Sequence, residues 1–152
     1  MRTDPGLLKR MKFFDSCSES QLDKVADMCT TREFKVKDIL FEQYDKLSEV
    51  YILTEGRLSL GISLPHDKRI QLGTIEEGQL FSWSAVFAPY ISTAWVMAIT
   101  PAKVIAINAE KLNELIGKDC DFGLRIMSRI ADTISRRLHD TRFQLMNQLT
   151  LL

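Results

Sequence analysis

Cysteine and histidine are scarce in this sequence of 152 residues. Its three cysteines, Cys17, Cys29 and Cys120, are far apart, and neither of its two histidines, His66 and His139, has other ligand types at metal-binding spacing. An odd number of scattered cysteines gives no disulfide framework, and so few ligands argue against a metal centre built on several cysteine or histidine side chains. The sequence therefore predicts reduced thiols in a cytoplasmic protein.

Long apolar runs and a surplus of one charge are also absent. No segment approaches the ~18 consecutive apolar residues of a membrane-spanning helix, and the N-terminus lacks the apolar core of a signal peptide. Twenty Lys and Arg balance twenty Asp and Glu, whereas a dedicated nucleic-acid binder carries a basic surplus. No nucleophile–base pair, paired-carboxylate motif or metal motif indicates an enzyme. We therefore expect a non-enzymatic protein with no membrane association and no direct DNA binding.

The length suits one domain, and the pattern of apolar residues divides it into three parts. Residues 1–31 are predicted to form N-terminal helices. Pro5 suits a first helical turn, and Ser18 followed by Gln21 is a capping-box pattern before a second helix. That helix places its apolar residues on one face: Leu22, Val25, Ala26 and Cys29.

Residues 32–107 change to an apolar–polar alternation with a period of two, which is typical of strands. Leu58–Leu64 alternates and predicts a strand with one buried face, whereas the short apolar runs 50–53 and 104–107 predict inner strands. Residues 65–68 are predicted to form a hairpin tip. Several short strands of this kind predict a sandwich or barrel. Four glycines are expected in turns between these strands: Gly56, Gly61, Gly73 and Gly78.

Residues 108–152 predict two C-terminal helices. Asn108 is positioned to cap a short helix through Ile116, with Gly117 as its stop. A long helix begins near 119–121, and a heptad seam along it predicts a homodimer. In the alternative interpretation, this helix packs only on its own domain. The candidate dimer interface comprises Met127, Ala131, Ile134, Leu138, Thr141, Leu145 and Leu152.

Five segments follow one another in an order that is typical of a known family: Phe-Phe at 13–14, Val-Tyr-Ile-Leu-Thr-Glu-Gly-Arg-Leu at 50–58, Gly-Gln-Leu-Phe at 78–81, Thr-Ala-Trp-Val at 93–96 and Ile-Ser-Arg-Arg-Leu at 134–138. Together they resemble the cyclic-nucleotide-binding domain family, in its Crp/Fnr-like effector branch. The resemblance implies an α+β fold: a cyclic-nucleotide-binding β-roll (a double-stranded β-helix or jelly roll) of about eight strands, flanked by N-terminal helices and a long C-terminal helix. It also implies a single domain over 1–152, with no DNA-binding domain.

The resemblance locates a phosphate-binding cassette, and the chain departs from the family there. The family usually has a Gly, a Glu that binds the ribose hydroxyl, and an Arg that pairs with the cyclic phosphate. Here these three positions hold Ser82, Trp83 and Ser92, while the usual Thr93 and Ala94 are retained. Trp83 has two interpretations that the sequence leaves open, a wall or plug of the pocket and a core residue among its aromatic neighbours. The resemblance therefore implies a degenerate cassette that binds cyclic AMP weakly or not at all.

The local sequence offers hydroxyl groups but no cation for an anion in this pocket, because no Lys or Arg lies between Arg69 and Lys103. A short helix is expected to begin at Ser84, and its amide end would favour an anion. On the long helix, the resemblance places Thr141 and Arg142 where the family contacts the base. The candidate ligand-binding residues are Phe81, Ser82, Trp83, Ser84, Ala85, Ser92, Thr93, Ala94, Thr141 and Arg142, and no residue is assigned to catalysis or to a metal.

These features favour a stand-alone regulatory or sensor module that acts as a homodimer. Its ligand would be an atypical small anion or a weakly bound cyclic nucleotide, and it would signal through the pose of its long helix. The alternative is a ligand-free protein-interaction module of the same fold, which binds a protein partner through its barrel or helix face. No cofactor is certain, and a cyclic nucleotide or another small anionic ligand is the candidate.

Overall fold

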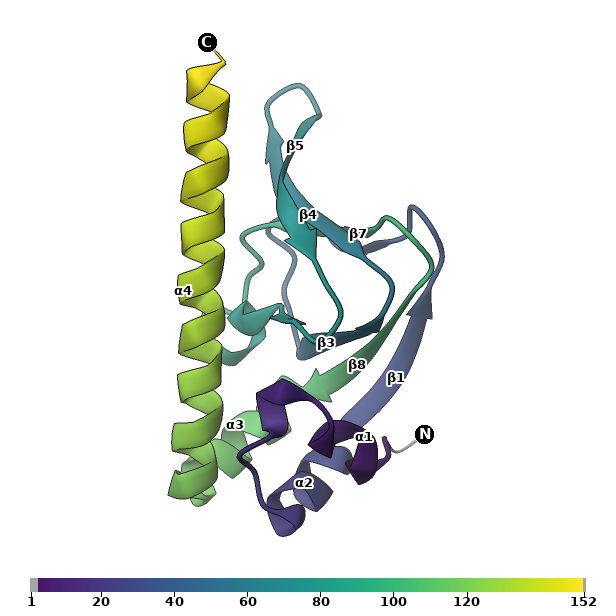
Figure 1. Ribbon diagram of the computed structural model, residues 1–152, viewed down its shortest axis with the longest axis vertical. Coiled ribbons are helices and arrows are strands. Elements are labelled where there is room, and N and C mark those ends of the chain that lie inside the picture. Colours follow the sequence, from purple (N-terminus) through teal and green to yellow (C-terminus); the bar gives the residue numbers. More distant parts are fainter. Residues whose placement is uncertain (1–2, 152) are drawn as a thin grey trace.

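Two four-stranded antiparallel sheets form the body of the computed structural model, which describes residues 3–151 (Figure 1). One sheet has the strand order β1-β8-β3-β6 and the other has the order β2-β7-β4-β5. This architecture confirms the predicted β-roll. The strands are β1 (Cys29–Phe34), β2 (Ile39–Phe41), β3 (Glu49–Glu55), β4 (Leu58–Leu64), β5 (Lys68–Ile75), β6 (Leu80–Phe81), β7 (Trp95–Ala98) and β8 (Ala102–Asn108).

The helices lie beside the roll (Figure 1). At its base are α1 (Pro5–Lys9), η1 (Lys12–Phe14), α2 (Glu19–Ala26) and α3 (Ala109–Lys118), while η2 (Trp83–Val86) lies between β6 and β7 in the chain, and α4 (Cys120–Thr150) runs along one side. The first strand begins at Cys29, three residues before the boundary that the sequence suggested.

Capping residues define the N-terminal helices, as the sequence predicts. Pro5 occupies the first turn of α1. Ser18 and Gln21 form a reciprocal capping box on α2: the Ser18 Oγ accepts from Gln21 N at 3.2 Å, and the Gln21 Oε1 accepts from Ser18 N at 3.0 Å. After α2, the Cys29 Sγ donates to Val25 O at 3.1 Å. Burial raises the pKa of Cys29 to about 12, so this side chain remains a protonated thiol at neutral pH.

Strands β3 and β8 form the inner part of the roll. Residues 50–53 and 104–107 are all buried, which confirms them as inner strands. They are also paired with each other, with Val50 opposite Ile107 and Leu53 opposite Val104. The two runs therefore stabilise one another across a single antiparallel ladder.

Strand β4 departs from the predicted alternation. Its first four residues, from Leu58 to Gly61, are all buried, and only the last three become accessible. Strand β4 is a central strand of its sheet, and its second face is covered as well. At Gly61 this cover is Trp95 of β7, because a Cβ added to Gly61 would overlap Trp95 Cζ2 and the carbonyl oxygen of Ile70.

The four glycines of the roll do not all lie in turns. Gly56 and Gly78 occupy turns with φ of +93° and +87°. Gly61 and Gly73 instead lie inside β4 and β5, next to each other across a shift in register. The prediction of four turns was wrong for these two. At Gly61 the close approach of neighbouring groups selects glycine, whereas a Cβ at Gly73 would meet only Arg137 Nη1, at 3.5 Å.

The two C-terminal helices meet at Asp119. Asn108 caps α3 with its side chain, as predicted. Helix α3 continues through Gly117 to Lys118 instead of stopping after Ile116. It ends at Asp119, whose backbone is extended and whose side chain caps α4. One residue therefore ends the first helix and starts the second.

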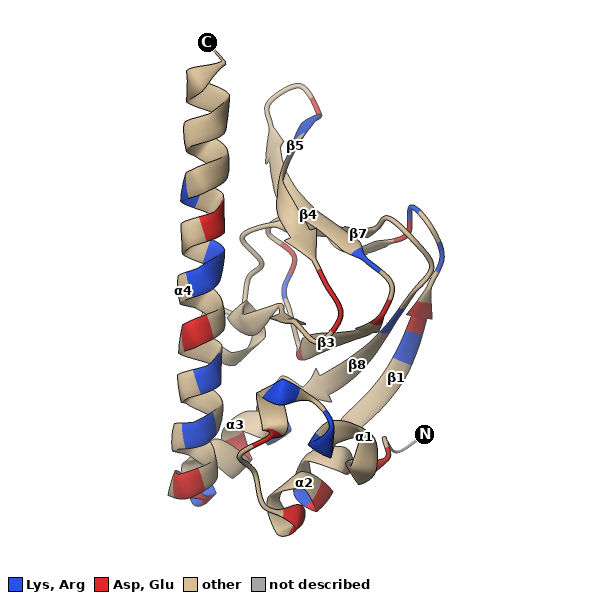
Figure 2. Ribbon diagram, viewed as in Figure 1, with Lys and Arg blue, Asp and Glu red and all other residues tan. Residues whose placement is uncertain are grey.

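Helix α4 is buried only along its N-terminal part, at Phe122, Gly123, Ile126 and Ile130. Farther along, it extends beside the β4–β5 hairpin (Figure 1). Charges of both signs lie along most of the helix, but its last turns carry none (Figure 2). Among residues 3–151, no helix combines the length and the apolar character that a bilayer crossing needs. Those last turns instead expose large apolar side chains: Phe143, Leu145, Met146, Leu149 and Leu151.

Alanine substitutions at two glycines should change stability in opposite directions. Gly61→Ala forces a Cβ into Ile70 and Trp95, so it should lower the free energy of unfolding by about 1–3 kcal/mol. Gly117→Ala meets no atom within 4 Å inside α3, so it should raise that free energy by about 0.4–1 kcal/mol. Urea unfolding of both variants measures the changes. A neutral Gly61→Ala would contradict the close packing of β4 against β7.

Candidate functional site

A cavity of about 40 Å³ lies between the roll, the cassette and α4. The cassette here means residues 81–94, from the end of β6 through η2 to the start of β7. Most of the cavity wall is apolar, with four hydroxyl side chains and one guanidinium. The lining residues are Phe41, Leu47, Leu60, Ile75, Phe81, Ser82, Trp83, Ser84, Ser92, Thr93, Ala94, Val96 and Arg137.

Seven of the ten predicted ligand-binding residues line this cavity, and Ala85, Thr141 and Arg142 do not. Ala85 lies in a 3₁₀ turn, in which successive side chains point in different directions, and it lines a separate groove. Thr141 is one helical turn, about 6 Å, beyond Arg137 along α4. Arg142 is exposed. The tertiary structure therefore assembles the cassette around the cavity but places Arg137, not Thr141 or Arg142, against it.

Ser82 has the left-handed backbone conformation, with φ +60° and ψ +35°. Glycine adopts this conformation most easily, and glycine is the residue that the family resemblance implies here. The Ser82 Oγ donates to Glu49 O at 2.9 Å and accepts from Tyr51 N at 3.1 Å. A hydroxyl has one proton to donate. Ser82 therefore joins the cassette to β3 and has no donor left for a ligand.

Ser92 is committed to its own turn in the same way. Its Oγ donates to Ala94 O at 2.5 Å and accepts from Ala94 N at 3.2 Å, and only 3% of the residue is exposed. The hydroxyls of Ser84 and Thr93 make no hydrogen bond to any residue within 3–151. These two, rather than Ser82 and Ser92, are the hydroxyl donors that the cavity offers to a ligand.

Trp83 lines the cavity, is partly buried, and packs against the hydrophobic core. It therefore combines the two roles that the sequence leaves open. The cavity beside it has room for only a few water molecules, at ~10–15 Å³ or more for each, whereas sites for small organic ligands measure ~300–1,000 Å³. The expected short helix is a single 3₁₀ turn of four residues, so its dipole contributes little to anion binding.

The basic residue of the cavity comes from α4 and was not predicted. Arg137 Nη1 donates to Thr74 O on β5 at 3.1 Å. Its neighbour Arg136 pairs with Asp132, but no carboxylate within residues 3–151 forms an ion pair with Arg137. Burial lowers the pKa of Arg137 and the charge of Asp140 raises it, yet an arginine stays protonated in proteins. Its guanidinium has five N–H donors, so donors remain for an anion.

Helical spacing is the sequence signal that could have found Arg137. It precedes Thr141 by four residues, so the two lie on the same face of α4. The sequence between Arg69 and Lys103 contains no Lys or Arg, and on the long helix the predicted ligand contacts were Thr141 and Arg142. The cavity receives its cation from a segment more than forty residues farther along the chain.

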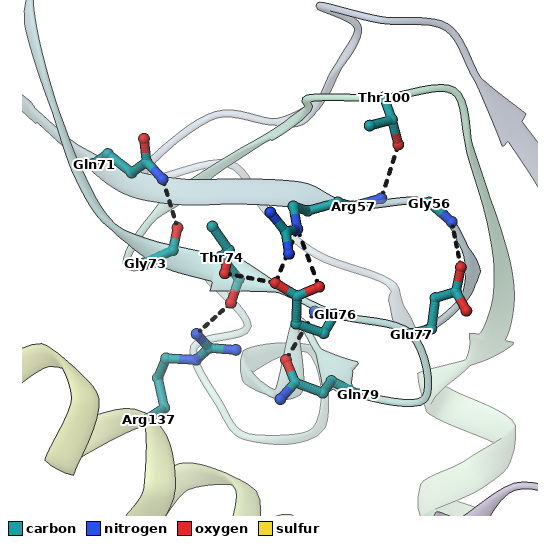
Figure 3. Close-up of polar contacts among 10 residues, drawn as sticks. All are labelled: Gly56, Arg57, Gln71, Gly73, Thr74, Glu76, Glu77, Gln79, Thr100 and Arg137. Atoms are coloured by element: carbon teal, nitrogen blue, oxygen red, sulfur yellow. Dashed lines mark hydrogen bonds and ion pairs between the residues drawn. The ribbon is translucent and has the colours of Figure 1, made fainter.

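Arg137 also begins a chain of polar contacts across the roll (Figure 3). Thr74 accepts from Arg137 through its carbonyl oxygen, and its Oγ1 donates to Glu76 Oε1 at 3.0 Å. Glu76 accepts from Arg57 Nε, with Oε2 at 3.1 Å. The Arg57 backbone N donates to Thr100 Oγ1 at 2.9 Å. Helix α4 is thus connected through β5 to the β3–β4 and β7–β8 turns.

The donors at this site suit an anion. Ser84 and Thr93 offer neutral hydroxyls, and Arg137 offers charge-assisted hydrogen bonds, which are about twice as strong as neutral ones. Residues 3–151 contain no group of three or more His, Cys, Asp or Glu side chains that could hold a metal ion. The arrangement therefore places hydrogen-bond donors and one positive charge at a small, mostly apolar cavity.

Two substitutions of Ser82 should separate the effect of its hydrogen bonds from that of its backbone conformation. Ser82→Ala leaves Glu49 O and Tyr51 N without this partner, so it should lower the free energy of unfolding by about 1–3 kcal/mol. Ser82→Gly loses the same bonds but relieves the left-handed strain, so its loss should be smaller by about 1–2 kcal/mol. Urea unfolding compares the two variants. Equal losses would show that the left-handed conformation carries no cost.

Comparisons with known proteins agree with this geometry. The cAMP-activated global transcriptional regulator CRP of Pasteurella multocida is 23% identical over 120 residues, which are 78% of this chain and 56% of that protein. This chain therefore spans just over half the length of that curated relative. A crystal structure of a putative cyclic nucleotide-binding protein from Geobacter metallireducens has a TM-score of 0.79 at 25% identity, and the match covers 90% of this chain and 99% of that chain.

A second structural comparison concerns a complex with a ligand. The regulatory domain of Toxoplasma gondii PKA, solved with cAMP, has a TM-score of 0.73 at 21% identity, and the match covers 87% of this chain and 48% of that chain. The family model described as "Cyclic nucleotide-binding domain" matches residues 31–119, which is more than half of the sequence and includes the cassette and all of the roll except the first two residues of β1. The chain belongs to the cyclic nucleotide-binding domain family.

Proposed function

We propose that this chain is a regulatory module whose cavity takes a small anionic ligand and binds a cyclic nucleotide weakly. The observation that carries the proposal is Arg137, a guanidinium without a carboxylate partner within residues 3–151, at the cavity of a cyclic nucleotide-binding fold. One relative is described as cAMP-activated, and one similar structure was solved with cAMP. Cyclic nucleotides are therefore the first ligands to test.

Weak nucleotide binding follows from the size and the donors of the cavity. A volume of about 40 Å³ is far below the ~300 Å³ of a small ligand site, so a nucleotide enters only if Trp83 or α4 moves. Trp83 has one N–H donor and no acceptor for a ribose hydroxyl. Ser92 has already given its proton to Ala94 O. A smaller anion that needs only Arg137 and the two remaining hydroxyls avoids these costs.

The hydrogen bond between Arg137 and Thr74 would transmit ligand binding to α4. Within residues 3–151, it is the hydrogen bond nearest to the C-terminal end of α4 that joins this helix to another element. An anion in the cavity attracts the same guanidinium and competes with the Thr74 carbonyl. A ligand shifts a conformational equilibrium only by binding one state better than the other. When the Arg137 guanidinium leaves Thr74 O and binds the ligand instead, the ligand gains affinity for the pose of α4 in which this hydrogen bond is broken.

The first test compares Arg137→Gln with Arg136→Gln, the exposed neighbour that does not line the cavity. A thermal-shift titration with cyclic AMP, cyclic GMP and sodium sulfate reports binding, because a ligand of the native state raises the unfolding midpoint. Arg137→Gln should weaken binding by about 10- to 100-fold, since charged hydrogen bonds contribute about 1.5–3 kcal/mol. Arg136→Gln should bind as the unsubstituted protein does.

Two results would contradict this proposal. Tight cyclic AMP binding by the unsubstituted protein would show that Trp83 and Ser92 are compatible with the usual ligand of the family. A failure of all three anions to shift the midpoint would favour the second candidate function, a ligand-free interaction module, which the small volume of the cavity also favours. Calorimetry on Trp83→Glu combined with Ser92→Arg tests the cassette itself, and this double variant should gain affinity for cyclic AMP.

We also propose that the module acts as a homodimer through α4. Along this helix, apolar residues recur every seven positions at Leu124, Ala131, Leu138 and Leu145, and all four are exposed. Leu124 was not among the predicted interface residues and extends the stripe to the base of the helix. From Leu124 to Leu145 the stripe is about 32 Å long. A heptad stripe of this length is typical of a helix that pairs with another helix.

The predicted interface residues differ in exposure. Ala131, Leu138 and Leu145 are exposed, whereas Met127, Ile134 and Thr141 are partly buried. The partly buried members lie between the stripe and the face that packs on the roll, so they support both contacts. Leu152, the last predicted member, lies outside the described residues. The homodimer itself remains a prediction.

Charged substitutions in the heptad stripe of α4 should dissociate the proposed homodimer. Leu138→Glu combined with Leu145→Glu buries unpaired carboxylates in the proposed seam, so sedimentation should show monomers where the unsubstituted protein shows dimers. Phe143→Glu is the matched control, because this exposed residue lies about 140° around α4 from Leu138. It should leave the dimer intact. An unsubstituted protein that remains monomeric at high micromolar concentration would refute the proposal.

A further inference from the structure

A second hollow lies next to the cassette. It is a groove of about 620 Å³ between the N-terminal part of α3, η2 and the β2–β3 connection, and we refer to it as the α3 groove. Its volume falls in the range of ligand and peptide sites, ~300–1,000 Å³, whereas that of the cavity does not. The three residues that offer donors to an anion, Ser84, Thr93 and Arg137, do not line it, and Leu47 is the one residue that lines both hollows.

The charge of the α3 groove is acidic. Glu110 and Glu114 are one turn apart on the exposed side of α3, and neither carboxylate forms an ion pair with any residue within 3–151. Like charges at this spacing repel each other. A cation between the two carboxylates is attracted by both of them and also reduces their mutual repulsion. Lys46 is the one basic residue of the groove. The lining therefore carries a net charge of −1, opposite in sign to the guanidinium of the cavity.

An aromatic side chain is fixed at the α3 groove. Tyr90 has a φ of +63°, a conformation that is rare for a bulky residue and that persists only where the surroundings impose it. Here its backbone N donates to Phe87 O at 2.8 Å, and its carbonyl accepts from Leu47 N at 2.7 Å. The residue is 39% exposed. Tyr90, Glu110 and Glu114 line the same groove, and this combination suits a lysine or arginine, which binds aromatic faces as well as anions.

The floor of the α3 groove is the cassette itself. Ala85 of η2 lines it, and Asn113 of α3 donates from Nδ2 to Val86 O at 3.1 Å. This bond uses the donor side of the Asn113 amide and leaves its oxygen as a further acceptor. The groove thus combines acceptors, an aromatic ring and an apolar floor, all on elements that are held by hydrogen bonds.

We propose that the α3 groove binds a basic segment of a partner protein, in which a lysine or arginine is followed by an apolar side chain. The cation lies between Glu110, Glu114 and the Tyr90 ring, and the apolar side chain lies on Ala85. Charge complementarity identifies the occupant, since an acidic or neutral segment leaves the two carboxylates unpaired. The proposal does not depend on whether the cavity binds an anion.

The test selects peptides from a random displayed library on the immobilised full chain and measures one selected peptide by fluorescence anisotropy. Selected peptides should be enriched in lysine and arginine next to leucine or a similar apolar residue. Glu110→Gln and Glu114→Gln should each weaken binding by about two- to fivefold, and Lys46→Gln should strengthen it. This opposite sign distinguishes an electrostatic contact from a general loss of structure. Added salt should weaken binding as well.

Two further variants complete the design. Asp67→Asn removes an exposed carboxylate at the β4–β5 hairpin tip, where φ is +59° and asparagine is well tolerated, so peptide binding should not change. Tyr90→Asn likewise suits a positive φ and should weaken binding by about two- to fivefold. Selection of acidic or neutral peptides, or an equal loss in Asp67→Asn and Glu114→Gln, would overturn the proposal.

Discussion

The close packing of α4 against α3 and the roll positions the rest of the site. Gly123 lies so near α3 that a Cβ there would be 2.7 Å from Ile116 O, and Phe122, Ile126 and Ile130 beside it are buried. A continuous helix of 31 residues transmits this anchoring along its axis, so Arg137 lies about 10 Å beyond Ile130 in a defined direction. The guanidinium of Arg137 therefore reaches the cavity because of contacts that α4 makes about two helical turns closer to its N-terminus.

The proposed function makes ligand recognition and helix position parts of one equilibrium. The cassette uses the hydroxyls of Ser82 and Ser92 internally, and the guanidinium comes from α4. In the proposed function, an anion and the Thr74 carbonyl compete for Arg137. Any anion that gains from Arg137 therefore also changes what holds α4 to β5.

The cassette turn η2 separates two surfaces of opposite charge. Trp83 and Ser84 face the cavity with Arg137, and Ala85 faces the α3 groove with Glu110. The four residues of η2 include residues that line each hollow, so a displacement of this turn at one hollow also changes the shape of the other. The side-chain amide of Asn113 bonds to Val86 O and makes α3 part of this unit. The proposed anion site and the proposed partner site are thus both lined by residues of the same short segment.

The sequence alone determined the features that depend on neighbouring residues. The Ser18–Gln21 capping box, the Asn108 cap, the inner strands at 50–53 and 104–107 and the order of helices and strands all follow from local patterns, whose energetics involve residues a few positions apart. Only the tertiary structure decided the rest. The burial of both faces of β4, the place of Gly61 inside a strand, and the arrival of Arg137 at the cavity each depend on which surfaces meet across the fold. A pattern of apolar and polar residues shows which side of an element is buried, but the identity of the group that covers it depends on contacts between residues far apart in the chain.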